Sequence, residues 1–135
     1  MGERLIHFDV KGDKSGSLVP LESQKNIPFA IKRVFYIYGV GKDEQRGSHT
    51  QKTLQEVVVC LSGSCKIRLE DEKGEKTFEL SRPDIGLYIG PMVWREMTDF
   101  SSGCILLALA DQLYDEKDYI RNYEQYRQAL KARSR

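Results

Sequence analysis

The sequence is poor in the residues that would mark several large classes of protein. It has two histidines, three cysteines and one tryptophan, and its formal net charge is only +1. A balanced charge without a basic stripe argues against nucleic-acid binding. The longest apolar run, Cys104 to Ala110, is too short to span a bilayer. The first residues, Met1-Gly2-Glu3-Arg4, lack the apolar stretch of a secretion signal. We therefore expect neither a nucleic-acid partner nor membrane insertion.

The few cysteines indicate the compartment. Cys60, Cys65 and Cys104 all lie inside apolar, strand-like runs. An odd number in such positions favours buried free thiols over a disulfide or a metal cluster. Free thiols persist in reducing compartments, so we expect a cytoplasmic protein.

The length of 135 residues predicts one domain, residues 1–135. Short runs rich in apolar, β-branched and aromatic residues recur along it, with turn residues between them. The expected strands are 5–10, 17–22, 31–38, 55–61, 64–70, 76–80, 86–89, 93–97 and 104–110. This spacing predicts an all-β sandwich or barrel.

The C-terminal segment follows a helical period. Four apolar residues recur at spacings of four, three and four: Tyr119, Tyr123, Tyr126 and Leu130. These positions share one face of a helix, and Asp115 and Asp118 are candidate N-caps. We expect this face to pack on the barrel or on a second subunit.

One stretch, Arg46 to Lys52, stands at a predicted loop-to-strand junction and carries a motif. The spacing is His49-x-Gln51, four residues, Glu56, six residues, Gly63. It is similar to the first motif of a cupin barrel, His-x-His-x(3,4)-Glu-x(6)-Gly, with Gln51 in place of the second histidine. A motif of this kind needs the right structural context for confirmation.

His49 is the leading candidate for chemistry. Residues two apart on a strand share a face, so His49 and Gln51 can point together into a barrel mouth. Imidazole is well suited to proton transfer near neutral pH. We predict a general acid/base role, the alternative being a surface or satisfied core histidine.

A metal site is not predicted. Cupin metals usually need two or three histidines and a glutamate, whereas this chain offers His49 and at most Glu56. The other histidine, His7, falls in the first expected strand. One imidazole and one carboxylate make a poor transition-metal site, so we expect neither a metal nor another cofactor.

Two arginines point to an anionic substrate. Arg33 interrupts an apolar strand, and Arg46 precedes His49 by three residues. Guanidinium groups suit bidentate phosphate binding. The alternative is that both are solvated charges.

The segment 86–97 contains a further group of candidates. Trp94 is either a core residue or an aromatic wall for a nucleobase. Arg95 and Glu96 follow it and cannot both be buried without partners. Tyr36, on the strand that carries Arg33, offers a hydroxyl group.

Taken together, these residues resemble the dTDP-sugar 3,4-ketoisomerases, cupins of deoxysugar biosynthesis. The matching stretches are 16–18, 26–29, 31–37, 46–49, 59–64, 85–91, 93–94, 99–100 and 114–123. A more distant similarity is to the dTDP-4-keto-6-deoxyglucose 3,5-epimerases, which share the fold and the arginine before the histidine.

The resemblance implies an all-β cupin jelly-roll barrel with a short C-terminal helix. It implies a metal-free homodimer whose N-terminal strands can exchange between subunits. The implied reaction converts dTDP-4-keto-6-deoxy-D-glucose to its 3-keto isomer, which a PLP-dependent aminotransferase uses for a 3-amino-3,6-dideoxyhexose. The family's catalytic histidine falls on His49 and its diphosphate-contacting arginine on Arg46. The full expected substrate-binding set is Arg33, Arg46, Gln51, Tyr36, Trp94 and Arg95.

Two positions depart from the family pattern. The second histidine of Arg-Gly-x-His-x-His-Lys is thought to share proton transfer, and the amide of Gln51 does not titrate. At Arg95 the family varies between histidine and arginine, in step with galacto and gluco products, so Arg95 favours the gluco product. The paired position near the N-terminal turn is arginine or tyrosine in those types, and here it is Ser15.

These residues predict that His49 removes the C3 proton and that a proton returns at C4. Gln51, Tyr36 or a water would then donate hydrogen bonds to the enediolate oxygens. Two alternatives stay open, a 3,5-epimerase-like activity on the same substrate and a non-catalytic sugar-nucleotide-binding cupin. The retention of Arg33, Arg46 and His49 favours an enzyme.

Overall fold

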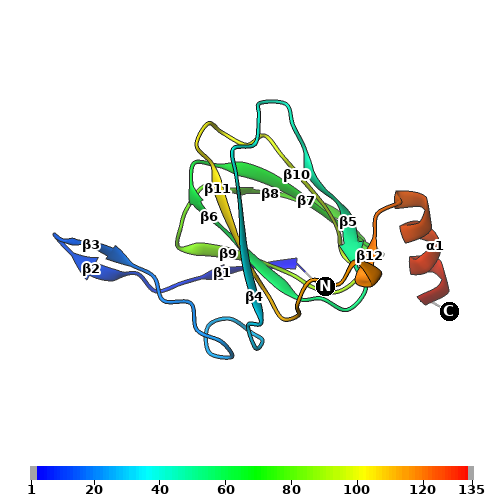
Figure 1. The fold of residues 1–135 in the computed structure, drawn as a ribbon, viewed down its shortest axis with the longest axis horizontal. Coiled ribbons are helices and arrows are strands. Elements are labelled where there is room, and N and C mark those ends of the chain that lie inside the picture. Colours follow the sequence, from blue (N-terminus) through cyan, green and yellow to red (C-terminus); the bar gives the residue numbers. More distant parts are fainter. Residues whose placement is uncertain (1–2, 134–135) are drawn as a thin grey trace.

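The computed structural model describes residues 3–133 and shows two facing β-sheets that form a barrel, with one helix packed at its side (Figure 1). One sheet has the strand order β1-β9-β6-β11-β4 and the other β12-β5-β10-β7-β8. Their bounds are β1 Glu3–His7, β4 Arg33–Tyr38, β5 Arg46–Gln51, β6 Glu56–Ser62, β7 Cys65–Asp71, β8 Gly74–Leu80, β9 Ile85–Ile89, β10 Trp94–Thr98, β11 Ile105–Ala110 and β12 Tyr119–Ile120. The predicted all-β barrel with a short C-terminal helix is confirmed.

The core between the sheets follows from alternating apolar residues. On β7, Cys65, Ile67 and Leu69 are buried, and the two residues that alternate with them, Lys66 and Arg68, are more exposed. The central strand β6 is apolar from Val57 to Leu61, and its residues Val57 to Cys60 are buried because both faces of the strand are covered there. Val58 faces the core between the sheets, whereas Val57 packs in a second cluster outside the barrel. The N-terminal segment supplies that second cluster with Phe8, Ile27 and Phe29.

The N-terminal region differs from the sequence prediction. The segment between the first two expected strands belongs to a hairpin of β2 Lys11–Asp13 and β3 Gly16–Leu18, which projects away from the barrel (Figure 1). The expected strand at 17–22 ends at Leu18. All residues of both hairpin strands are exposed, so no hydrophobic alternation marked them. The strand β5 was also missed as such, because its sequence is polar and glycine-containing.

The helix α1 spans Tyr123–Arg133 and begins later than the tyrosine spacing predicted. Tyr119 lies instead in β12, which pairs with β5. The predicted N-caps were wrong for this helix. Asp115 caps the short 3₁₀ helix η1 Glu116–Asp118, and the Asn122 side chain accepts from the backbone N–H of Gln125 at 2.9 Å.

Tyr126 anchors α1 to the barrel. Its ring is buried with Leu130 against Met92 and Trp94. Its hydroxyl lies 2.8 Å from the carbonyl oxygen of Glu70 and 2.9 Å from that of Met92, either of which can accept its proton. Burial raises the pKa of Tyr126 to about 12, so the hydroxyl keeps its proton at neutral pH.

The three cysteines are free and buried, as predicted. Their sulfur atoms lie within 4.8 Å of one another in the core between the sheets. Burial raises the pKa of Cys60 to about 11, which keeps this thiol protonated and unreactive. In residues 3–133 we find no helix with both the length and the apolar character that a membrane span requires.

We predict that Tyr126→Phe lowers the free energy of unfolding by about 1–3 kcal/mol, because the buried carbonyl groups of Glu70 and Met92 lose the hydroxyl donor that they share. Urea denaturation measures the change. Glu124→Gln is the control, since the Glu124 side chain is exposed on the same helix and its substitution should change stability little. Equal effects of the two substitutions would contradict the anchoring role of Tyr126.

Candidate active site

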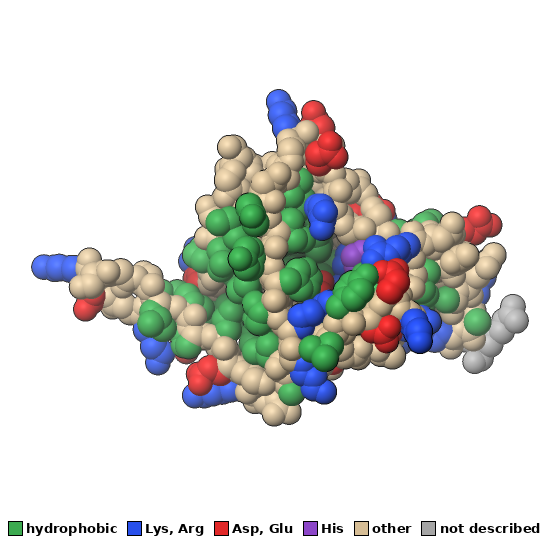
Figure 2. Space-filling view, viewed as in Figure 1, with side chains coloured by type: hydrophobic (Ala, Val, Ile, Leu, Met, Phe, Trp, Pro, Cys, Tyr) green, Lys and Arg blue, Asp and Glu red, His purple; other side chains and the backbone are tan. Residues whose placement is uncertain are grey.

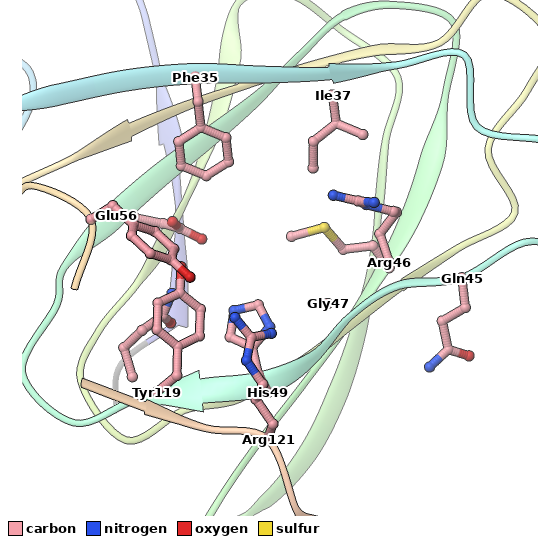
Figure 3. A pocket seen from close by; sticks show the side chains of 12 residues that line it. Phe35, Ile37, Gln45, Arg46, Gly47, His49, Glu56, Tyr119 and Arg121 are labelled. Atoms are coloured by element: carbon pink, nitrogen blue, oxygen red, sulfur yellow. The ribbon is translucent and has the colours of Figure 1, made fainter. Parts of the chain in front are cut away.

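A cavity of about 370 Å³ opens at one end of the barrel and takes residues from both sheets (Figure 3). Strand β4 supplies Phe35 and Ile37, and β6 supplies Glu56. The facing sheet supplies a row of residues from β5. That row is Arg46, Gly47, His49 and Gln51. The segment after β11 closes one side with Tyr114, Tyr119 and Arg121.

A local irregularity of β5 brings Arg46 and His49 into the same cavity. Residues three apart on a regular strand face opposite sides of the sheet. Here Gly47 has φ +87° and Ser48 has φ +59°, and the pairing of β5 with β10 shifts register at this point. A Cβ on Gly47 would lie 3.0 Å from the Arg95 carbonyl oxygen, so only glycine fits this close approach. The bulge therefore aligns an arginine with the histidine.

His49 is held as a neutral base. Burial and the positive charge of Arg95 lower the pKa of His49 from 6.5 to about 4. Its ring lies 4.9 Å from that of Tyr119, centre to centre, and its Nδ1 is buried without a hydrogen-bond partner in the described chain. A neutral imidazole with an unused nitrogen is competent to take a proton from a ligand.

Arg95 and Glu56 form a buried ion pair beneath the cavity. The Arg95 side chain is 0% exposed, and its Nη1 lies 2.9 Å from Glu56 Oε1. Its Nη2 donates to the carbonyl oxygen of Val93 at 2.9 Å. Because β10 and β6 belong to different sheets, this pair joins the two sheets under the site. The guanidinium charge also adds to the effect of burial in lowering the pKa of His49.

Unpaired buried polar atoms gather at this one place. Within residues 3–133, the buried side-chain atoms without a partner are Arg33 Nε and Nη2, His49 Nδ1, Gln51 Oε1, Glu56 Oε2 and Arg95 Nε. Each such atom costs about 1–3 kcal/mol if nothing binds it. All of them lie in the cavity or beside it, which indicates a site built to receive a polar ligand.

The site residues predicted from the sequence lie at different places relative to the cavity. Arg46, His49 and Gln51 line the cavity together. Arg33 lies beside it, with its guanidinium 5.0 Å from the ring of Phe35 and 5.7 Å from that of Tyr114.

Arg95 lies beneath the cavity, and two other predicted residues are not brought into it. Tyr36 points outward from β4, because it alternates with Phe35 and Ile37. Trp94 is 2% exposed and packs under α1, 5.3 Å from the ring of Tyr126. Its Nε1 donates to Glu96 at 2.9 Å, so the core interpretation of Trp94 fits better than a nucleobase wall.

Arg121 and Tyr119 are site residues that the sequence analysis missed. The Arg121 guanidinium lies 4.3 Å from the Tyr119 ring and donates twice to Glu116 at 2.8 Å. This contact lowers the pKa of Glu116 to about 2. Figure 2 shows histidine atoms recessed among basic side chains on this face. The clustered guanidinium groups favour an anionic ligand.

The donor atoms suit proton transfer better than a transition metal. Among the described residues, the cavity lining contains one imidazole, His49, and one carboxylate, Glu56. One oxygen of that carboxylate is already bound by Arg95. Because the Arg95 guanidinium lies 2.9 Å from the Glu56 carboxylate and already balances its charge, this carboxylate would attract a metal ion only weakly.

The known proteins to which this chain is similar include several sugar 3,4-ketoisomerases. A family model described as FdtA: WxcM-like, C-terminal, matches residues 1–131. The chain is 48% identical over 130 residues to the TDP-4-oxo-6-deoxy-alpha-D-glucose-3,4-oxoisomerase of Aneurinibacillus thermoaerophilus, covering 96% of this chain and 94% of that protein.

Two crystal structures extend the comparison. The chain is 54% identical, with a TM-score of 0.95, to QdtA, a sugar 3,4-ketoisomerase from Thermoanaerobacterium thermosaccharolyticum in complex with TDP, covering 98% of this chain and 96% of that one. It is 46% identical, with a TM-score of 0.88, to the WlaRB TDP-quinovose 3,4-ketoisomerase of Campylobacter jejuni, covering 92% and 95%.

We predict that the His49 ring titrates near pH 4 in the folded protein, where an ordinary histidine titrates near 6.5. Because the folded state resists protonation, the contribution of His49 to stability is full above pH 6.5 and is lost as pH falls towards 4. The Cε1–H chemical shift, assigned with a His49→Gln variant, measures this midpoint. A midpoint at or above 6.5 would contradict the electrostatic role of Arg95.

Proposed function

Because this chain belongs to the FdtA, WxcM-like C-terminal family of sugar 3,4-ketoisomerase enzymes, we propose that it converts dTDP-4-keto-6-deoxy-D-glucose to a dTDP-3-keto-6-deoxyhexose. The observation that carries the proposal is the set of unpaired polar atoms around a neutral His49 in a cavity bordered by arginines. The 3-keto product suits a PLP-dependent aminotransferase that makes a 3-amino-3,6-dideoxyhexose. Buried free thiols support a cytoplasmic setting.

The arginines would bind the diphosphate. Arg46 and Arg121 line the cavity from β5 and from the segment after β12. Arg33, beside the cavity, has two buried N–H donors without partners. The N–H donors of these three guanidinium groups suit the oxygens of a diphosphate. This mode of binding does not require Trp94 to contact the ligand.

His49 would carry the carbon-bound proton. The C4 ketone acidifies the C3 proton, and a neutral imidazole can remove it to give an enediolate. Arg95 disfavours the resulting imidazolium, so the proton returns readily, now to C4. One base serves both steps if the two protons lie on one face of the sugar. The Gln51 amide can hold an enediolate oxygen by a hydrogen bond but cannot titrate.

Arg95 supports the gluco product over the galacto product. In the family resemblance, arginine at this position accompanies the quinovose type. Arg95 lies under His49 and Glu56, so it would act on the C4 configuration through them. Ser15 lies at the turn of the β2–β3 hairpin, which projects away from this chain's own barrel (Figure 1).

A homodimer with exchanged N-terminal strands would explain two exposed features. The outward face of β4 carries Val34, Tyr36 and Tyr38, exposed by 55%, 63% and 70%. An apolar patch over this strand is visible in Figure 2. Patches of this kind mark interaction surfaces. The projecting hairpin, with Leu18 exposed, could then contact the second subunit. A single-chain mass by light scattering at micromolar concentration would refute the dimer.

We expect the protein to exchange the C3 hydrogen of dTDP-4-keto-6-deoxyglucose in D₂O and to leave the C5 hydrogen untouched. Proton NMR follows the exchange, and an added 3-aminotransferase traps the product as a 3-amino sugar. The C4 coupling constants distinguish gluco from galacto. Exchange at both C3 and C5 would indicate an epimerase, and no exchange would indicate a binding protein.

Replacement of the base should separate chemistry from binding. We predict that His49→Asn lowers kcat by roughly 10²–10⁴-fold, the usual contribution of a general base, with the dissociation constant for TDP nearly unchanged. Gln51→His is the matched control on the same strand and should stay active. Substantial turnover by His49→Asn would mean that another group removes the C3 proton.

A further inference from the structure

The proposed reaction moves two protons, and His49 accounts for only one of them. The C3–H bond breaks, its electrons form a C3–C4 double bond, and the C4 carbonyl oxygen becomes an enolate that takes a proton. The O3–H bond then breaks, its electrons form the C3 carbonyl, and C4 receives the carbon-bound proton. A proton must therefore pass from O3 to O4 as well as from C3 to C4. This requirement rests on the proposed function.

Few described residues can carry the oxygen-bound proton. Gln51 faces the cavity, but an amide does not titrate near neutral pH. The hydroxyl of Tyr114 is engaged by Glu116, and this hydrogen bond raises the pKa of Tyr114. Glu56 is the one carboxylate of the cavity lining in residues 3–133.

The Glu56 carboxylate is held with one oxygen free. Its Oε1 accepts from Arg95 Nη1 at 2.9 Å, and its Oε2 is buried without a partner. The Arg95 Nε is also unpaired, so the contact is a single hydrogen bond and not the two-point pair that arginine and carboxylate usually prefer. A purely structural pair would be expected to use both oxygens. The Glu56 side chain and the His49 ring line the same cavity (Figure 3).

We propose that Glu56 is a second catalytic residue, whose Oε2 accepts the proton of the O3 hydroxyl and delivers it to O4. His49 and Glu56 reach the sugar from different sheets, β5 and β6. His49 therefore transfers the proton between C3 and C4, and Glu56 transfers the proton between O3 and O4. Arg95 is a positioning residue, because it fixes the Glu56 carboxylate through Oε1. Glu56 thus supplies the second proton carrier that the amide of Gln51 cannot supply.

The test uses Glu56→Gln in the full-length protein with dTDP-4-keto-6-deoxyglucose in D₂O. Glutamine keeps an oxygen for Arg95 and nearly the same shape, but it cannot carry a proton. We expect isomerisation to fall by roughly 10²–10⁴-fold. Deuterium should still enter C3 of unreacted substrate, because His49 and the C4 ketone remain. The dissociation constant for TDP should stay within about twofold.

Glu56→Asp is the companion variant, because it retains the carboxylate. We expect it to isomerise more than about tenfold faster than Glu56→Gln, an outcome that a role in folding alone would not produce. Wild-type rates in Glu56→Gln would overturn the proposal. Loss of both C3 exchange and isomerisation, with TDP binding intact, would also overturn it, since Glu56 would then act in enolisation. An inactive wild-type protein would refute the proposed function itself.

Discussion

The buried ion pair between Arg95 and Glu56 is the interaction on which the site depends. It crosses from one sheet to the other directly beneath the cavity, and Arg95 is completely buried. Buried pairs add little net stability, because desolvation offsets their attraction, but loss of one partner costs about 3–5 kcal/mol. The pair therefore constrains the structure strongly without being an efficient way to stabilise it. Its main consequence is its effect on the neighbouring groups of the site.

The Arg95 guanidinium affects His49 and Glu56 in opposite ways. Burial and, after it, the Arg95 charge favour the neutral form of His49, so the ring can act as a base. The same guanidinium balances the charge of Glu56 and leaves Oε2 unpaired. The bulge at Gly47 then adds Arg46 to the same cavity. The unpaired atoms are costly in the free protein, and a bound sugar nucleotide would satisfy them.

Local sequence patterns predicted much of this arrangement. The apolar alternation of β7 and the continuous apolar run of β6 required two packed sheets, and the motif around His49 located the site. Gln51 lines the cavity with His49, as residues two apart on a strand should, whereas Arg46 joins them only through the bulge at Gly47.

Features that depend on distant contacts were not predictable. Arg121 and Tyr119 reach the cavity because β12 pairs with β5, a strand far earlier in the chain. The spacing of the tyrosines is typical of a helix, so it did not predict that Tyr119 lies in a strand. Trp94 was included in the expected substrate-binding set, with a core position as the alternative, and no local pattern around it reveals that α1 covers it. The role of Glu56 depends on a partner 39 residues away on the opposite sheet.

The most direct test of this account is a crystal structure of the His49→Asn variant with dTDP-4-keto-6-deoxyglucose bound. The account predicts the O3 hydroxyl within about 3 Å of Glu56 Oε2, while Oε1 remains on Arg95. It also predicts the diphosphate at Arg46 and Arg121. A sugar whose O3 and O4 face away from Glu56, with both oxygens bound only to Gln51 or water, would contradict the central role of the Arg95–Glu56 pair.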